Sequence, residues 1–202
     1  MKLVIGLGNI GPEYEQSRHN AGFLCLRQWS SDHRLRFKKS KLFAYAQIPG
    51  ACLIMPATYM NRSGLALAEA LRRWSADDVM VVQDDIELPL GQLRLRNGGG
   101  DGGHNGVRSL LTVLPPGQLK RLRIGIGRGD GDPRDYVLDT FNEAELAALQ
   151  PVLDQAASFV DTFIQDGFTA VLNAYSIWKK SCSGDSSPGN ISPKEKPHDQ
   201  EL

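Results

Sequence analysis

The sequence has few cysteines and no long hydrophobic run. Its three cysteines, Cys25, Cys52 and Cys182, lie far apart among 202 residues and form no CxxC pair. This spacing argues against a disulfide framework and a zinc cluster, and it is typical of a protein from a reducing compartment. A membrane span needs about 18 consecutive apolar residues, and no run in the sequence approaches that length.

The apolar start of the chain, MKLVIGLG, does not fit a secretory signal. Pro12, Glu13 and Glu15 follow at once, so the apolar stretch is too short, and no small-residue cleavage site follows it. We therefore expect a cytoplasmic protein that does not associate with a membrane.

The chain has no net charge, yet its charges are unevenly distributed. Residues 1–130 carry 18 lysines and arginines against 11 acidic residues, whereas residues 131–202 carry 5 against 12. The imbalance suits either an ordinary solvated surface or a basic face that binds a polyanion. Only a site on the basic part of the chain can distinguish the two.

Short β-rich runs alternate with helical patterns. We expect strands over residues 2–7, 43–48, 51–55, 79–84, 92–96 and 121–126, and helices over 20–31, 62–74, 106–114, 143–164 and 167–179. Ser17 is a candidate cap for the first helix, and Asn142 with Glu145 resembles a capping box. The alternation predicts a single α/β domain over residues 1–180, with a mixed, mostly parallel β-sheet flanked by helices.

The last part of the sequence has a different composition. Residues 181–202 hold five serines and three prolines, with few large aliphatic side chains. Such a segment buries too little apolar surface to offset its ordering entropy, so we predict a disordered tail.

Residues 6–11 read Gly-Leu-Gly-Asn-Ile-Gly, which fits the dinucleotide-binding pattern GxGxxG. That pattern must open a helix whose N-terminus holds the pyrophosphate. Here Pro12 and a polar run intervene, and helical periodicity begins only near Asn20. We therefore interpret the glycines as a tight turn that allows a close backbone approach around Asn9.

Four polar clusters fall at the ends of expected elements. They are Asn9 with Tyr14 to Asn20, Pro56 to Gly64, Gln83 to Pro89, and Gly98 to Gly106. In open α/β sheets, ligands bind beyond the carboxyl ends of the strands, so these four loops are expected to line one pocket.

His19 is the best candidate for a general base, because an imidazole titrates near neutral pH. Side chains alternate along a strand, so only one of Asp84 and Asp85 is expected to face it. Asn9, Asn61 and Asn105 offer amide donors and acceptors that suit a neutral polar substrate or an oxyanion. A lone histidine is more often a cap or a satisfied core residue, and a lone asparagine is more often a turn former. The acidic pair is also compatible with a solvated turn before Pro89.

Other catalytic patterns are missing from the sequence. The loop Gly98–Gly106 lacks the GK[ST] end of a P-loop, which argues against NTP hydrolysis. The chain has neither a GxSxG elbow nor an HExxH motif nor a ligand-spaced Cys/His cluster, so neither serine catalysis nor a metal site is supported. Cys25 falls on an apolar helix and is expected in the core.

Taken together, these motifs resemble bacterial-type peptidyl-tRNA hydrolase over roughly residues 3–176. The segments that carry the resemblance are VIGLGNIGPEYEQSRHNAGF, PATYMNRSG, QDDIELPLGQLRLR, GGHNGVRSL, RLRIGIGR and YVLDTF. The chain departs from the family at Ile10, Ser17 and Gln83, where the family usually has Pro, Thr and His. Glu87 stands where the family often has Asp.

The resemblance implies an esterase that recycles peptidyl-tRNA by cleaving the ester between the peptide and the 3′-terminal ribose. The family uses neither metal nor cofactor and is mostly monomeric. By this resemblance His19 is the general base, Asp84 orients it, and Asn9 separates blocked from free aminoacyl-tRNA. The positions matching those that contact or shape the substrate site are Asn20, Tyr14, Tyr59, Met60, Asn61, His104 and Asn105.

Basic residues near these motifs support the polyanion interpretation. Arg94 and Arg96 are two residues apart and share one face of a strand, and Arg123 follows on the next strand. Arg108, Lys120, Arg121 and Arg128 lie nearby in the sequence. All these side chains are expected to contact phosphates of the tRNA acceptor stem, with little reading of bases.

Two other functions remain open at this point. One is an RNA-binding protein of the same fold that has lost hydrolysis, as in intron splicing, since a fold does not dictate a function. The other is a nucleotide-cofactor enzyme that would use Gly6–Gly11. The presence of His19, Asp84 and the three asparagines favours the hydrolase.

Overall fold

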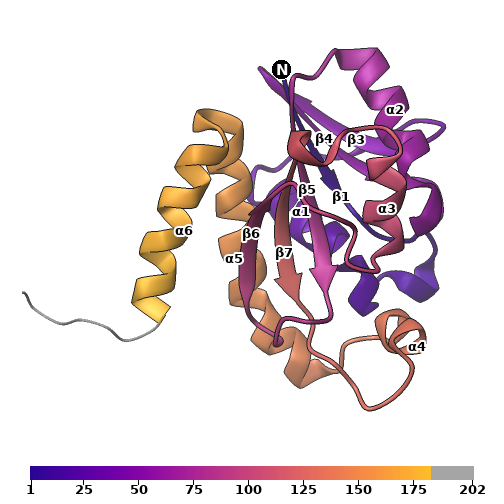
Figure 1. Cartoon of the computed structure of the whole chain (residues 1–202), viewed down its shortest axis with the longest axis vertical. Helices are drawn as coiled ribbons and strands as arrows, with labels where there is room; N and C mark the ends of the chain where they lie inside the picture. Colours follow the sequence, from indigo (N-terminus) through magenta and orange to yellow (C-terminus); the bar gives the residue numbers. More distant parts are fainter. Residues whose placement is uncertain (183–202) are drawn as a thin grey trace, which may run out of the picture.

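The β-rich runs of the sequence form one mixed, seven-stranded sheet in the computed structural model, which describes residues 1–182 (Figure 1). The strands are β1 (Lys2–Gly6), β2 (Lys38–Lys39), β3 (Phe43–Ile48), β4 (Ala51–Pro56), β5 (Asp78–Asp85), β6 (Leu93–Asn97) and β7 (Leu119–Gly125). Their order is β2-β3-β4-β1-β5-β7-β6. The central strands β4, β1, β5 and β7 run parallel, while β2, β3 and β6 pair antiparallel with their neighbours. The predicted fold class is confirmed.

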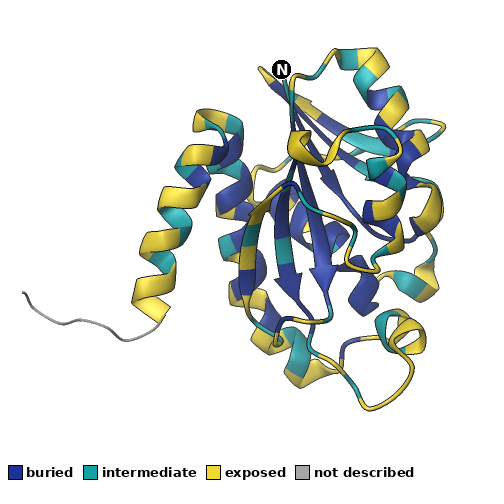
Figure 2. Ribbon diagram, in the orientation of Figure 1, coloured by how far each residue is buried: buried dark blue, intermediate teal, exposed yellow. Residues whose placement is uncertain are grey.

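Helices cover both faces of this sheet. They are α1 (Ala21–Asp32), α2 (Ser63–Trp74), α3 (Asn105–Leu111), α4 (Pro133–Leu138), α5 (Glu143–Asp166) and α6 (Phe168–Cys182). One core joins the sheet to α1, α5 and α6, and a second joins its other face to α2 and α3. Figure 2 shows the central strands as the most deeply buried part of the chain. Within residues 1–182, no helix has the length and apolar character needed to cross a bilayer.

The expected elements are present, with differences at their ends. The expected helix over 106–114 ends at Leu111, because Pro115 disfavours helical backbone in the residue before it. Helix α6 continues to Cys182, so Ser181 and Cys182 belong to it and not to the predicted tail. The rest of that tail, residues 183–202, lies outside the described residues.

One of the two predicted helix caps is correct. The Asn142 side chain accepts a hydrogen bond from Glu145 N at 2.9 Å, and the Glu145 carboxylate accepts one from Asn142 N at 2.8 Å. The prediction for Ser17 is wrong, because its buried hydroxyl has no partner among the described residues. Its carbonyl instead accepts from Asn20 N and starts a short 3-10 helix, Arg18–Asn20, ahead of α1.

The glycines of the sequence GLGNIG allow α1 to pack closely against β1. A Cβ atom at Gly6 would lie 2.7 Å from the Gly22 carbonyl oxygen, and one at Gly8 would lie 2.6 Å from the Phe23 ring. After Gly11 the chain forms a 3-10 turn, Pro12–Tyr14, and α1 begins only at Ala21. This geometry supports the close-approach interpretation and lacks the helix N-terminus that a pyrophosphate needs.

Gly22 is the tightest point of this packing, so we expect Gly22→Ala to destabilise the protein by about 1–3 kcal/mol or more. Its Cβ would lie 2.4 Å from the Val82 carbonyl oxygen and 2.5 Å from Leu7 N, which forces backbones apart. Urea unfolding followed by circular dichroism would measure the change. Gly117→Ala is the matched control, because a Cβ there meets nothing within 4 Å. Equal stability of the two variants would contradict the packing argument.

Candidate active site

A cavity of about 820 Å³ lies where the central parallel strands end. The loops that follow β1, β4, β5 and β6 line it, as the sequence predicted. The predicted site residues that line it are Asn9, His19, Tyr59, Met60, Asn61, Asp84, Arg96, His104, Asn105 and Arg123. The structure does not bring Tyr14, Asn20 or Arg94 to its walls.

A buried carboxylate joins two histidines in this cavity. Both oxygens of Asp84 lie 2.9 Å from His19 Nδ1, and Asp84 Oδ1 also lies 2.9 Å from His104 Nε2. Only 2% of Asp84 is exposed. Its neighbour Asp85 also lines the cavity, but its carboxylate pairs with Arg123 and not with His19. The alternation along β5 therefore delivers one carboxylate to His19, as expected.

The hydrogen bonds around the histidines determine which ring nitrogens carry protons. His104 Nδ1 accepts from the backbone of Gly106 at 3.1 Å, so its proton is on Nε2 and is donated to Asp84. His19 likewise donates Nδ1–H to Asp84. This arrangement leaves Nε2 of His19 unprotonated and available as a base in the neutral ring.

Electrostatics hold Asp84 ionised and make His19 more basic. Burial alone lowers the pKa of His19, but the Asp84 carboxylate favours the imidazolium more strongly, and the pKa lies above its ordinary value of 6.5. For the carboxyl group of Asp84 the two effects have the opposite signs. Burial raises its pKa, but the two histidines lower that pKa more strongly and hold it well below its usual range. The carboxylate is therefore charged at neutral pH.

Hydrogen bonds fix both the backbone and the side chain of Asn9. Its backbone N donates to Asn20 Oδ1 at 2.7 Å, and its carbonyl accepts from Asn20 Nδ2 at 3.0 Å. Its side-chain oxygen accepts from Met60 N at 2.9 Å, so its Nδ2 remains as a donor. Asn20 is 1% exposed and uses its amide on Asn9. Asn20 thus supports the site from behind, and Ile10 stands beside a turn that is already fixed.

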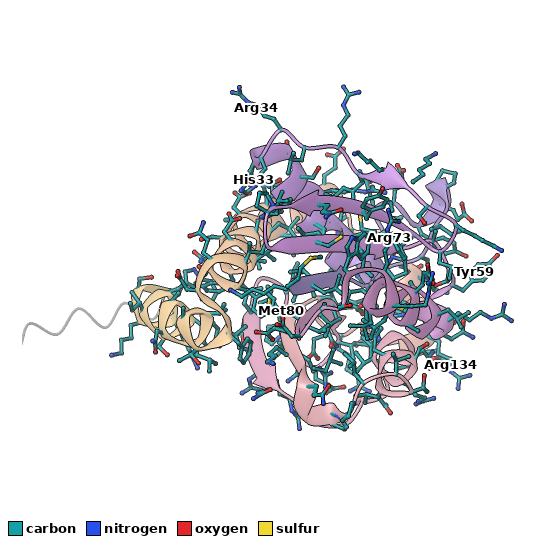
Figure 3. The ribbon with its side chains drawn as sticks, turned by 90° about the horizontal axis from the view of Figure 1, so that it is seen from above. His33, Arg34, Tyr59, Arg73, Met80 and Arg134 are labelled. Atoms are coloured by element: carbon teal, nitrogen blue, oxygen red, sulfur yellow. The ribbon has the colours of Figure 1, made fainter. Side chains whose placement is uncertain are left out.

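Two further asparagines and an aromatic ring stand at the mouth of the cavity. Tyr59 precedes the short 3-10 helix Met60–Arg62 and is 63% exposed. Figure 3 shows its ring projecting from the body of the protein. Asn61 lies in the same segment, and Asn105 is the first residue of α3. Both are exposed cavity residues whose side chains can reach a ligand.

Arginines gather on one face of β6 and β7. Arg94 is opposite Arg123, and Arg96 is opposite Arg121. Directly opposed residues of antiparallel strands share a face, so the four side chains lie on one face of the sheet. Arg94 and Arg96 are exposed there, whereas Arg121 is buried and Arg123 pairs with Asp85. Arg96, Arg121 and Arg123 reach the cavity, while Arg94 continues the surface outside it.

Arg121, which the sequence predicts only as a phosphate contact, is a buried support at the cavity wall. It is 3% exposed, donates to Gln83 Oε1 at 2.9 Å, and donates to the Gly100 carbonyl at 2.6 Å. Burial, followed by repulsion from Arg123 and Arg96, lowers the pKa of Arg121 to about 10. The glycine loop leads to His104. Arg121 thereby attaches this loop to strand β5.

Arg18 belongs to the polar cluster expected around His19, but it supports the site from outside the cavity wall. Its guanidinium donates to both oxygens of Glu145, at 2.7 and 2.8 Å, and to the Thr140 carbonyl at 2.6 Å. It also lies 4.5 Å from the centre of the Tyr136 ring. These contacts fasten the residue before His19 to the start of α5. Sequence reasoning lacked a signal for them, because the partners are more than 120 residues away.

Among the described residues, His19, Asp84 and His104 have donor atoms within 4.8 Å of one another, as a metal site would require. Each of these atoms already takes part in a hydrogen bond between the three side chains. A metal ion would have to displace two N–H protons, so the group fits a hydrogen-bonded network better. Burial raises the pKa of the Cys25 thiol, which agrees with its expected place in the core.

The pair His19–Asp84 predicts a defined pH dependence. If His19 acts as a base, activity rises with pH through its pKa, which Asp84 raises. We expect Asp84→Asn to move that rise to lower pH, because the charge that favours imidazolium is lost, and to reduce the plateau rate. A pH profile of kcat/KM would measure both changes. An unchanged profile would show that Asp84 does not act on His19.

Comparisons with known proteins agree on one family. The family model described as "Peptidyl-tRNA hydrolase" matches residues 3–183. The peptidyl-tRNA hydrolase of Geobacter metallireducens is 41% identical over 182 residues, covering 86% of this chain and 94% of that protein. That of Geobacillus kaustophilus is 42% identical over 184 residues, covering 87% and 99%. A crystal structure of the Acinetobacter baumannii enzyme superimposes with a TM-score of 0.77 at 32% identity, covering 86% and 93%.

Proposed function

Because the chain belongs to the peptidyl-tRNA hydrolase family, we propose that it is a carboxylic ester hydrolase acting on peptidyl-tRNA. It would cleave the ester between the peptide carboxyl and the 3′-terminal ribose of the tRNA. The observation that carries this proposal is the buried Asp84 carboxylate, which orients His19 with Nε2 free beside a cavity of substrate size. Binding RNA does not require an oriented base, so this pair favours hydrolysis over binding alone.

In the proposed reaction, His19 Nε2 takes a proton from a water molecule as its oxygen attacks the ester carbonyl carbon. The imidazolium that forms is stabilised by Asp84, 2.9 Å from Nδ1. The tetrahedral intermediate then expels the ribose oxygen, which receives the proton. The products are a free peptide carboxyl group and a tRNA hydroxyl group, so the step consumes one water molecule.

Amide groups around the cavity supply stabilisation for the oxyanion and the peptide. Asn9 has its side-chain oxygen occupied by Met60 N, which leaves Nδ2 as a donor. Asn61 and Asn105 offer further donors and acceptors at the mouth. One well-placed donor is worth about 10²–10³-fold in rate. No step in this scheme uses a metal ion or cofactor.

The RNA part of the substrate is proposed to lie along the arginines of β6 and β7. Arg96, Arg123 and Arg94 provide a positive surface beside the cavity, on the basic part of the chain. Such contacts neutralise phosphates without reading sequence, so affinity should fall steeply with salt. We further propose that one chain suffices for catalysis, because both histidines and the carboxylate come from the same chain.

The test is hydrolysis of N-acetyl-aminoacyl-tRNA and of unblocked aminoacyl-tRNA, each with EDTA present. We expect rapid cleavage of the blocked substrate only, because hydrolysis needs no metal and Asn9 selects the blocked amine. His19→Ala should lower the rate by about 10²–10⁴-fold, the usual worth of a general base.

His33→Ala provides the matched control, because His33 lies at the end of α1 and stacks on Trp29 away from the cavity. It should keep the wild-type rate. Binding of tRNA by the wild type without cleavage would overturn the hydrolase proposal and favour a non-catalytic RNA-binding protein of the same fold.

A further inference from the structure

A second basic surface lies at the edge of the sheet opposite β6. Residues 33–68 contain neither aspartate nor glutamate, yet they include six lysines and arginines. Five of these fall within eight residues and are all exposed. We name them the basic strip: Arg34, Arg36, Lys38, Lys39 and Lys41.

The backbone of this segment turns the cations outward. Leu35 and Phe37 pack against the core beside α1, so the alternating positions Arg34 and Arg36 face solvent. The short edge strand β2 then places its two lysines on opposite faces of the sheet, with Lys38 opposite Tyr45 and Lys39 opposite Ala44. Figure 3 shows Arg34 projecting away from the body of the protein.

Several exposed cations of the chain have acidic partners that the basic strip lacks among residues 1–182. Arg72 pairs with Glu69, Arg128 with Glu87 and Arg27 with Glu15. Within residues 1–182, no ion pair involves a member of the basic strip. Its charge is therefore available to an external polyanion.

The backbone of Arg34 gives an independent indication. Arg34 has a φ of 52° at the end of α1, with Leu35 N donating to the Ser30 carbonyl at 2.9 Å. Glycine is the favoured residue at this left-handed position, because a Cβ is strained there. The chain keeps a long cationic side chain where glycine would fit better, which suggests that the side chain is used outside the fold.

The strip ends at the same edge of the sheet as the cavity. The turn after Lys39 places Leu42 beside the strand end of β4, where the Leu42 carbonyl accepts from Ala57 N at 2.8 Å. The segment after Ala57 carries Tyr59 and Asn61 to the cavity mouth. In Figure 3, Tyr59 lies at the right of the view with Arg134 of α4 below it, and Arg34 lies at the top. The Lys41 end of the basic strip therefore lies on the β4 side of the cavity, and the arginines of β6 lie on the other side.

We propose that the basic strip is a second contact surface for the phosphate backbone of the tRNA. The inference rests on the proposed function, since it takes peptidyl-tRNA as the ligand. Strands β2 and β7 are five positions apart in the sheet, which is about 24 Å at the usual strand spacing. An RNA stem has a phosphate backbone on each side, so a stem over the cavity mouth can contact Arg96 and Arg123 with one and the basic strip with the other.

The exposed lysines of the basic strip have a second possible role, which predicts a different experimental result. Lysines on an edge strand also prevent two sheets from pairing edge to edge. If that were their only task, removing them would cause self-association and leave RNA binding intact.

The experiment compares the full chain with the triple variant Lys38→Gln, Lys39→Gln, Lys41→Gln. Its matched control is Arg27→Gln, Lys179→Gln, Lys180→Gln, which removes the same charge from helices α1 and α6. The substrates are N-acetyl-aminoacyl-tRNA and a short 3′-terminal oligonucleotide carrying the same ester. KM, kcat and the salt dependence of tRNA binding are measured, with light scattering for self-association.

We expect the strip variant to raise KM for the tRNA by about tenfold and to lower the slope of log K against log salt by about 2. Its kcat, and its KM for the oligonucleotide, should stay at wild-type values, as should all parameters of the control. If the strip variant keeps the wild-type KM and salt slope, the proposal is wrong. Self-association of that variant would then show that the lysines protect the sheet edge from pairing. Failure of the wild type to cleave the oligonucleotide ester and the tRNA would instead overturn the proposed function.

The variant Arg34→Gly distinguishes an effect on tRNA binding from an effect on stability. Because glycine relieves the left-handed backbone, the variant should unfold at the same or a higher urea concentration than wild type while its KM for the tRNA rises. A KM equal to that of wild type would show that the Arg34 side chain does not contact the RNA.

Discussion

The site depends on keeping one ionised carboxylate inside the protein. A buried charge is costly unless it is paired and hydrogen-bonded, and Asp84 has histidine N–H donors on two sides. Each donor is itself fixed, His104 by the backbone of α3 and His19 by the segment that Arg18 attaches to α5. The loops after β1, β5 and β6 are therefore drawn to one point, and the cavity is the space left between them.

Two supports outside the reacting groups keep this arrangement rigid. Asn20 holds both backbone polar atoms of Asn9, and Arg121 with Gln83 attaches the glycine loop to the strand that bears Asp84. Gln83 stands where the family usually has histidine. An amide cannot titrate, so the acceptor for Arg121 stays constant with pH while His19 changes its charge.

Local patterns predicted much of the fold and the centre of the site. The strands around residues 2–7 and 79–84 were recognisable because apolar runs were bounded by turn residues, and His19 and Asp84 stood out at their ends. The two-residue strand β2 and the six-residue helix α4 carry too few residues for a periodic pattern. Arg18 and Arg121 were missed as supports because their partners, Glu145 and Gln83, are close only in space.

The contact between Arg18 and Glu145 also constrains when the protein becomes active during its own synthesis. Domains form as the chain leaves the ribosome from its N-terminus, and contacts distant in sequence form last. His19 and Asp84 emerge early, but the segment before His19 lacks its anchor until residues 140–145 have been made. A nascent chain of 130 residues would hold every reacting group and still lack the residues that anchor Arg18 beside the base.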